Sequence, residues 1–194
     1  MHALVFLAKK TVETFIKKGE IISPSFAIEL LRRAKLSEDL PKEFLEKRSG
    51  TFVTIEKKEK LRGLPRSEPK VLLRGCIGTY LPTRENIAQE IIQNAIAAAT
   101  EDYRFGPIQE KELSSLSYTV YILSYPEPVK NINELDPKKY GIIVKTETKT
   151  GLLLPDLDGV DTIEKQLSIT CQKGGIDPLG EKIFIYRFTV EKYQ

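Results

Sequence analysis

The sequence of 194 residues contains few of the side chains on which common catalytic sites depend: one histidine, two cysteines, one methionine and no tryptophan. The histidine is His2, at the start of the first predicted helix, where it is poorly placed to activate a cysteine or serine nucleophile. A general base would therefore be Asp, Glu, Lys or Tyr. Two scattered cysteines and one histidine do not form a zinc ligand set either, so we predict no metal site.

Long apolar runs and closely spaced cysteines are also missing. No apolar segment approaches the roughly 20 residues that cross a bilayer, so we expect no membrane association. The hydrophobic residues 3–10 lack the positive region that begins a signal peptide, and they continue with helical spacing. Cys76 and Cys171 lie far apart in different predicted elements, which does not indicate a secreted disulfide framework. We therefore expect a cytoplasmic protein.

The charge is nearly balanced, with 30 Lys and Arg against 27 Asp and Glu, so no whole-protein field indicates a nucleic-acid partner. A phosphate-binding loop, a dinucleotide fingerprint and a serine nucleophile elbow are all missing, and we predict no cofactor. The length fits a single domain over residues 1–194, either undivided or formed by two lobes. Abundant Lys and Glu with a single Met are compatible with a thermophilic source.

Hydrophobic spacing and capping residues predict four helices and a short helical turn, over residues 4–19, 24–34, 82–102, 161–173 and 41–46. Gly19 is predicted to end the first helix, and Ser23 to cap the second. In the second helix Phe26, Leu30 and Leu31 are expected to face inward. Asp161 is predicted to cap the last helix, with Glu164 in capping-box register.

Alternation and β-branched residues predict six strands, over residues 50–55, 71–80, 117–123, 141–145, 151–154 and 182–190. Either Phe52, or Thr51 and Val53, should face the core in the first strand. Residues 141–154 read as a hairpin. Mixed helices and strands with this short turn favour an α/β (α+β) fold, in which a largely antiparallel sheet is flanked by helices.

Residues 73–80, Leu-Arg-Gly-Cys-Ile-Gly-Thr-Tyr, are the run that packing alone explains least well. Glycine weakens a strand, and its usual compensation is a close approach by a ligand or another backbone. Two glycines would leave the Cys76 sulfur with few neighbours, and Arg74, two residues back, should project from the same strand face. Since a nearby cation favours a thiolate, Cys76 is a candidate nucleophile, thiol carrier or redox switch. The alternative is a small hydrophobe that fills space.

Arg74 and Arg104 are candidates to hold a carboxylate or phosphate, because guanidinium groups bind both in bidentate fashion. Gly75 and Gly78 would let backbone amides approach the same anion. The alternative is an internal salt bridge of Arg104 with Asp102 or Asp156.

The motif Arg74-Gly75-Cys76-Ile77-Gly78-Thr79, followed by an aromatic residue, resembles the signature of the AMMECR-one domain family. The resemblance covers residues 50–193 and includes residues 102–105, Asp-Tyr-Arg-Phe, and residues 153–157, Leu-Leu-Pro-Asp-Leu. It implies an α/β arrangement of a larger and a smaller lobe with a cleft between them. The predicted site consists of catalytic Cys76 and the ligand-binding residues Arg74, Gly75, Gly78, Thr79, Asp102, Arg104 and Asp156.

Three functions follow as hypotheses. The first is an enzyme or enzyme-partner domain that binds an anionic small-molecule or nucleotide-like ligand around the motif. Prokaryotic family members often accompany Memo-type and radical SAM proteins, which suggests a modification pathway for RNA or a metabolite. The second is a non-catalytic protein-interaction module that uses the signature strand and residues 59–70. The third is nucleic-acid binding through the basic residues Lys57, Lys58, Lys60, Arg62, Arg66 and Lys70.

Overall fold

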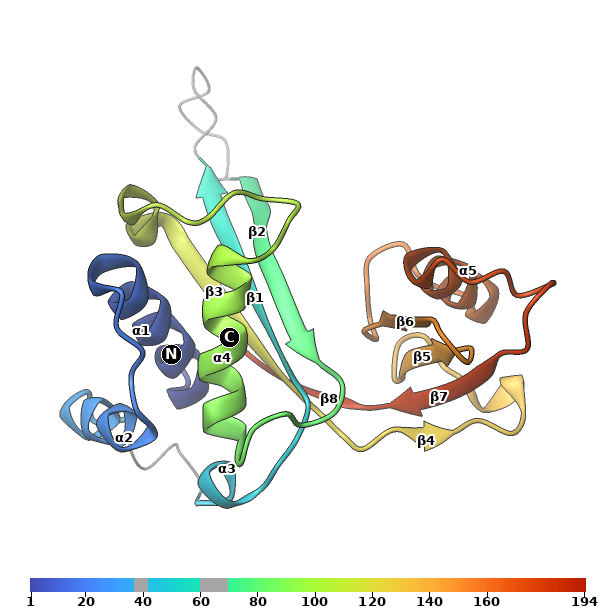
Figure 1. Ribbon diagram of the computed structural model, residues 1–194, viewed down its shortest axis with the longest axis horizontal. Helices are drawn as coiled ribbons and strands as arrows, with labels where there is room; N and C mark the ends of the chain where they lie inside the picture. The colour runs from blue at the N-terminus through green and yellow to red at the C-terminus, as the bar shows by residue number, and fades with distance from the viewer. Residues whose placement is uncertain (37–41, 60–69) are drawn as a thin grey trace. The chain divides into compact units, whose positions relative to one another are not determined.

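The computed structural model describes residues 1–36, 42–59 and 70–194 (Figure 1). The chain forms two compact units, one of residues 1–122 with 192–194 and the other of residues 123–191. Each unit has its own four-stranded sheet and its own hydrophobic core. The predicted α+β fold with largely antiparallel pairing and flanking helices is confirmed, although it contains two sheets where we expected one.

The sheet of the first unit has the strand order β2-β1-β3-β8. β1 (Thr51–Glu59) lies between β2 (Lys70–Thr79) and β3 (Leu116–Leu123) and pairs antiparallel with both, while β8 (Val190–Tyr193) flanks β3. Val53 and Ile55 of β1 are fully buried, as is Thr51. The inward-facing set is therefore Thr51 and Val53, the second of the two alternatives, and Phe52 belongs to the opposite face of the sheet.

The helices of the first unit are α1 (Ala3–Lys18), α2 (Pro24–Arg33), α3 (Glu43–Glu46) and α4 (Ile87–Thr100), followed by the 3₁₀ helix η2 (Glu110–Ser115). Figure 1 shows α1 beside α4, which crosses the sheet. Ile91, Ala95 and Ala98 of α4 are buried, and these residues form a narrow face that packs closely on the sheet. No helix in the described ranges combines the length and the apolar character that a membrane span requires.

Two helix predictions need correction in detail. α1 ends at Gly19 with φ of 70°, and Ser23 accepts a hydrogen bond from the Phe26 amide, as predicted. However, Phe26 is 43% exposed, because the inward face of α2 is formed by Ala27 and Leu31, which are one turn apart. α4 begins at Ile87 rather than near residue 82, since Asn86 is its N-cap.

The second unit has a sheet of strand order β4-β7-β5-β6 and one long helix. Its elements are β4 (Glu127–Pro128), the 3₁₀ helix η3 (Ile132–Glu134), β5 (Gly141–Lys145), β6 (Thr150–Leu153), α5 (Ile163–Gly174) and β7 (Phe184–Phe188). β5 and β6 form the predicted antiparallel hairpin. The predicted last strand is instead two strands, β7 and β8, which belong to different sheets.

The N-terminus of α5 also differs from the prediction by one residue. Thr162 is the N-cap, and its hydroxyl accepts a hydrogen bond from the Lys165 amide at 3.2 Å. The Asp161 carboxylate instead lies 2.8 Å from Lys138 Nζ. Both Thr and Asp are good N-cap residues, and here Thr162 caps the helix while the neighbouring Asp161 forms a surface ion pair.

Candidate functional site

A β-bulge in the signature strand determines where its side chains point. Ile55 of β1 pairs with Gly75 of β2, whereas the next residue, Glu56, pairs with Leu73, so Arg74 is an extra residue without a partner. A bulge interrupts the two-residue alternation of a strand. We predicted that Arg74 and Cys76 share a face because residues two apart in a regular strand do so. The bulge lies at Arg74, so that rule does not apply here.

Arg74 is bound on the side of the sheet opposite to Cys76. Its Nε and Nη2 donate to the two carboxylate oxygens of Glu112 at 3.0 Å each, and Lys57 Nζ lies 3.5 Å from the same carboxylate. Lys57 shares its strand face with Val53 and Ile55, while Cys76 pairs with Thr54 on the other face. The prediction that Arg74 projects beside Cys76 was therefore wrong.

The Arg74 guanidinium also closes the loop that precedes η2. Nη1 and Nη2 donate to the carbonyl oxygens of Gly106 and Pro107, at 2.8 and 3.2 Å. Arg74 thus donates four hydrogen bonds within the protein. A guanidinium has only five N–H groups, so little capacity remains for binding an anion. A role for Arg74 in ligand binding stays a prediction, and its visible role is to hold η2 and its loop to the signature strand.

Arg74 and Glu112 give the fold a defined pH dependence. The hydrogen bonds from Arg74 outweigh burial and lower the pKa of the Glu112 carboxyl from 4.5 to about 2. A carboxyl with a depressed pKa stabilises the folded state above its unfolded pKa, and this stabilisation is lost as the pH falls toward the folded pKa. We expect Glu112→Gln to cost about 2 kcal/mol near neutral pH, and the difference from the parent to shrink steadily below about pH 4.5.

Urea unfolding of parent and variant between about pH 3 and pH 7 measures this difference. Glu110→Gln, an exposed neighbour in the same 3₁₀ helix, is the matched control and should show no such pH dependence. A Glu112→Gln deficit of the same size at both ends of the pH range would contradict the assignment.

Packing explains both glycines of the signature. A Cβ added to Gly75 would lie 2.0 Å from the carbonyl oxygen of Ala98, so Gly75 is the place where α4 meets the sheet. A Cβ on Gly78 would lie 2.3 Å from the Phe52 ring and 2.3 Å from the carbonyl oxygen of Thr51. The close approach expected at these glycines therefore exists, but the approaching atoms belong to the protein itself. Ligand binding by their backbone amides stays a prediction.

Thr79, at the end of the signature strand, is tied to a buried carboxylate. Its hydroxyl donates to Glu90 Oε1 at 2.6 Å, and the Thr83 hydroxyl donates to the same oxygen at 2.8 Å. Glu90 Oε2 accepts from the backbone amides of Thr83 and Arg84, at 2.7 and 2.8 Å. Glu90 is fully buried, so these four donors replace its hydration. Sequence reasoning missed Glu90, because its spacing in α4 is that of an ordinary helical residue.

Cys76 is half-buried on the other face of the sheet, and its sulfur, amide and carbonyl oxygen all form hydrogen bonds. Its sulfur accepts a hydrogen bond from the Thr54 hydroxyl at 3.2 Å. Its amide donates to Asp102 Oδ2 at 2.8 Å, and its carbonyl oxygen accepts from Arg104 Nη2 at 3.4 Å. The sulfur thus has a polar neighbour in a half-buried position, and the cation at this strand position is Arg104 rather than Arg74.

Asp102 and Arg104 form the internal ion pair that was the alternative to a shared anion site. Arg104 Nε and Nη2 donate to the two carboxylate oxygens of Asp102, at 2.9 and 2.7 Å. These hydrogen bonds outweigh burial and hold the pKa of Asp102 below its ordinary value. The Asp102 side chain is buried, but the Arg104 side chain is 45% exposed. The pair therefore fixes one edge of the guanidinium while the rest of it stays accessible.

Tyr121 is a further polar side chain on the face of Cys76. Across the three strands, Cys76 aligns with Thr54 and Thr119, and the next row on the same face contains Gly78, Phe52 and Tyr121. Burial raises the pKa of the Tyr121 phenol, and the charges of Cys76 and Glu56 raise it further. Neither Tyr121 nor Thr54 was a predicted site residue, because only strand register reveals their relation to Cys76.

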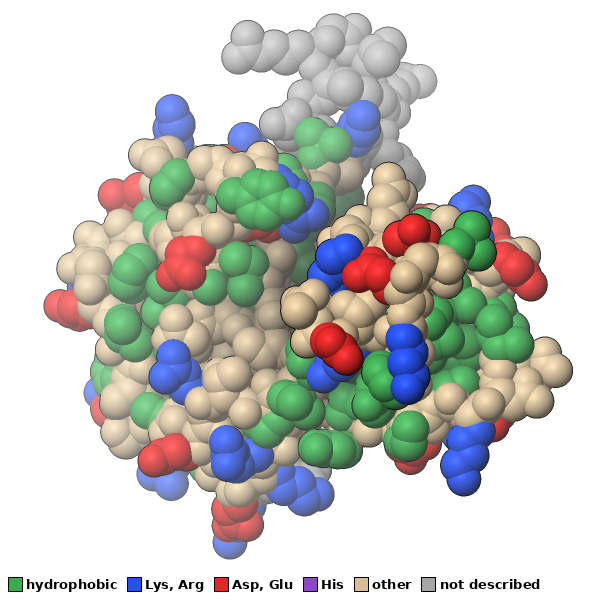
Figure 2. Space-filling model, turned by 45° about the vertical axis from the view of Figure 1, so that its right-hand side comes forward, with side chains coloured by type: hydrophobic (Ala, Val, Ile, Leu, Met, Phe, Trp, Pro, Cys, Tyr) green, Lys and Arg blue, Asp and Glu red, His purple; other side chains and the backbone are tan. Residues whose placement is uncertain are grey.

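Asp156 and the basic residues considered for nucleic-acid binding do not belong to the group of residues around Cys76. Asp156 belongs to the second unit, where it is exposed, has a φ of 53° and lies 3.8 Å from Lys138 Nζ. Of the basic residues considered for nucleic acid, Lys57 pairs with Glu112, while Lys60, Arg62 and Arg66 lie outside the described residues. Charges of both signs are interspersed on the face shown in Figure 2. No group of potential metal ligands occurs within the described ranges.

Fold and site together define an α+β protein of two antiparallel sheets, with a half-buried thiol on the signature strand. The comparisons agree with this class: residues 5–193 match the AMMECR1 family, and the chain belongs to that family. A Thermotoga maritima protein is 46% identical over 193 residues, which cover all of this chain and 98% of the relative. A Thermococcus gammatolerans protein is 36% identical and is 88% covered.

One relative is longer and one has a known structure. A Clostridium acetobutylicum protein is 37% identical over 191 residues, but this chain spans only 34% of its length. The crystal structure of the uncharacterized protein PH0010 from Pyrococcus horikoshii superposes with a TM-score of 0.77 at 30% identity, covering 97% of this chain and 88% of that one. Several of these relatives come from thermophiles, which agrees with the composition.

Proposed function

We propose that this protein binds a small anionic ligand at the sheet face that carries Cys76, and that Cys76 reacts with it or is protected by it. The observation that carries the proposal is the hydrogen bond from the Thr54 hydroxyl to the Cys76 sulfur. A donor to sulfur favours the charged thiolate over the thiol, and the thiolate is the nucleophile. The ligand-binding cation in this proposal is Arg104.

Arg104 suits this role because its orientation is preset. Asp102 holds Nε and Nη2, and no partner of Nη1 occurs among the described residues. A guanidinium oriented in advance loses less freedom on binding a carboxylate or phosphate than a free side chain does. The predicted cleft between two lobes is not needed here, because all these groups belong to the first unit.

Alkylation of the native protein by iodoacetamide, followed at each cysteine by mass spectrometry, tests the proposal. Cys171 is the internal control, since it is 4% exposed and burial raises the pKa of its thiol. We expect Cys76 to react while Cys171 does not, and Thr54→Val to slow the reaction of Cys76 several-fold near neutral pH. A Cys76 thiol that reacts only after denaturation would remove the proposal.

Inorganic phosphate is the probe for the anion site. Millimolar phosphate should slow alkylation of Cys76 in the parent and in Arg104→Lys, which keeps the charge, but not in Arg104→Gln. The Asp102 pairing is lost or altered in both variants, so the contrast between them isolates the charge of residue 104. Equal protection in Arg104→Gln would show that the anion binds elsewhere.

A second candidate function, a protein-interaction module, is supported by exposed apolar residues near the signature. Leu73 is 41% exposed and Tyr103 is 95% exposed, and large exposed apolar side chains often mark partner surfaces. Purified Memo-type and radical SAM proteins are the partners to test. Loss of binding in Leu73→Asp with full binding by Cys76→Ser would favour this function over ligand chemistry.

A further inference from the structure

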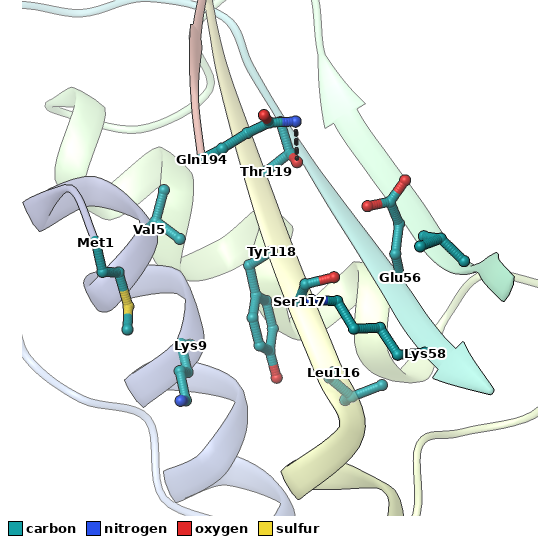
Figure 3. Close-up of a pocket in the computed structure, with 11 residues that line it drawn as sticks. Met1, Val5, Lys9, Glu56, Lys58, Leu116, Ser117, Tyr118, Thr119 and Gln194 are labelled. Atoms are coloured by element: carbon teal, nitrogen blue, oxygen red, sulfur yellow. Dashed lines mark hydrogen bonds between the residues drawn. The ribbon is translucent and has the colours of Figure 1, made fainter. Parts of the chain in front are cut away.

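A pocket of about 380 Å³ lies beside β3 in the first unit and does not include Cys76 (Figure 3). α1 forms one wall, with Val5 and Lys9, and β1 contributes Glu56 and Lys58 from the sheet. Figure 3 shows the Tyr118 ring between α1 and β3. The pocket therefore follows the edge of β3, next to the point where Gln194 Nε2 donates to the Thr119 hydroxyl at 3.4 Å.

The lining combines apolar side chains with a cation that has no partner in the described part of the chain. Val5, Val71 and Leu116 supply apolar surface. Lys58 is exposed and has no hydrogen-bond or ion-pair partner among the described residues, and Figure 3 shows its side chain reaching from β1 toward Ser117. Lys9 Nζ is only loosely paired, 3.8 Å from Glu13. Two lysines against one lining carboxylate, Glu56, favour an anionic guest.

The Tyr118 ring closes this wall from the inside. The residue is 5% exposed, and its hydroxyl has no hydrogen-bond partner in the described structure. Burial raises the pKa of this phenol, so it stays a neutral donor at physiological pH. The hydroxyl is inaccessible to solvent, so a guest in the pocket contacts the tyrosine ring and not its oxygen.

We propose that this pocket binds a medium-chain carboxylate, a molecule with an apolar body and one anionic head. The apolar chain lies along the edge of β3 against Val5 and Leu116, and the carboxylate meets the Lys58 ammonium, which reaches this edge from the other face of the sheet. The volume fits such a ligand, since small-molecule sites begin at roughly 300 Å³. The site is separate from the anion site of Arg104 and does not depend on any reaction of Cys76.

Octanoate is the probe, and 1-octanol is its uncharged match. Titrations followed by backbone amide NMR shifts should place octanoate at residues 116–119 and at Val5, with octanol binding about tenfold more weakly, which corresponds to about 1.4 kcal/mol. Lys58→Gln should weaken octanoate by a similar factor and leave octanol unchanged. Lys70→Gln, an exposed lysine of β2 outside the pocket, is the matched control and should bind octanoate as the parent does.

Other outcomes overturn the proposal. Shifts confined to α5 and residues 176–183 would place the ligand in a different apolar pocket, which is lined by Leu167 and Ile183. Equal affinities for octanoate and octanol would exclude a role for Lys58. Arg104→Gln should bind octanoate normally, and Lys58→Gln should retain phosphate protection of Cys76. The two sites can therefore fail independently.

Discussion

Gly75→Ala is expected to lower the melting temperature by about 10 °C, because a destabilisation of about 3 kcal/mol shifts a chain of this size by that order. The new Cβ would lie 2.0 Å from the carbonyl oxygen of Ala98, which is backbone of α4 and cannot turn aside as a side chain can. Either α4 moves away from the sheet or the signature strand bends. Both movements would loosen the packing of Ile91 and Ala95 on β1.

Gly106→Ala is the matched control, since an added Cβ there has no heavy atom within 4 Å and its backbone conformation suits alanine. It should change the melting temperature by no more than a degree or two. Thermal unfolding followed by circular dichroism gives the melting temperatures of both variants and of the parent. If Gly75→Ala melts with the parent, the contact between α4 and the signature strand is not the reason for glycine at this position.

Glu90→Ala should cost about 3 kcal/mol of unfolding free energy, because it removes the common acceptor of four hydrogen bonds and leaves a cavity where the fully buried carboxylate was. The donors are the hydroxyls of Thr79 and Thr83 and the amides of Thr83 and Arg84. Glu90→Gln should be milder, because its oxygen can still accept from the two amides while the threonine hydroxyls turn to accept from its NH₂ group.

Urea unfolding gives the free energies, and hydrogen exchange gives the location. In both Glu90 variants the Thr83 and Arg84 amides should exchange faster, in the order Ala, Gln, parent. Glu101→Ala, at the exposed end of α4, is the control and should remain within about 0.5 kcal/mol of the parent. A Glu90→Ala protein as stable as this control would show that the buried carboxylate does not hold the end of the signature strand.

Local sequence signals predicted the elements of the fold well where an element depends on contacts between residues that are close in the sequence. The glycine that ends α1, the serine that caps α2 and the β5–β6 hairpin all depend on residues within a few positions of one another. The prediction of one sheet failed at Thr189. Whether a chain continues in one sheet or enters a second depends on which distant strands pair with it, and strand propensity contains no such information.

For the candidate site, sequence analysis selected residues that the structure brings together, Cys76, Asp102 and Arg104, but it misplaced Arg74. Cys76 lies on the signature strand and Arg104 lies beside it, as the two motifs suggested. Arg74 faces the other way, because one extra residue in β2 breaks the alternation used to predict its direction. Bulges depend on pairing with the neighbouring strand, so a single strand read in isolation does not reveal them.

The sequence by itself determined the family, the mixture of helices and antiparallel strands, and the thiol most worth testing, because these follow from short motifs and local periodicity. Only the tertiary structure decided that Thr54 and Tyr121 share the face of Cys76, that Glu112 takes Arg74, and that Ala98 requires Gly75. These relations join residues from different elements, and they exist only once register and helix packing bring those elements into contact.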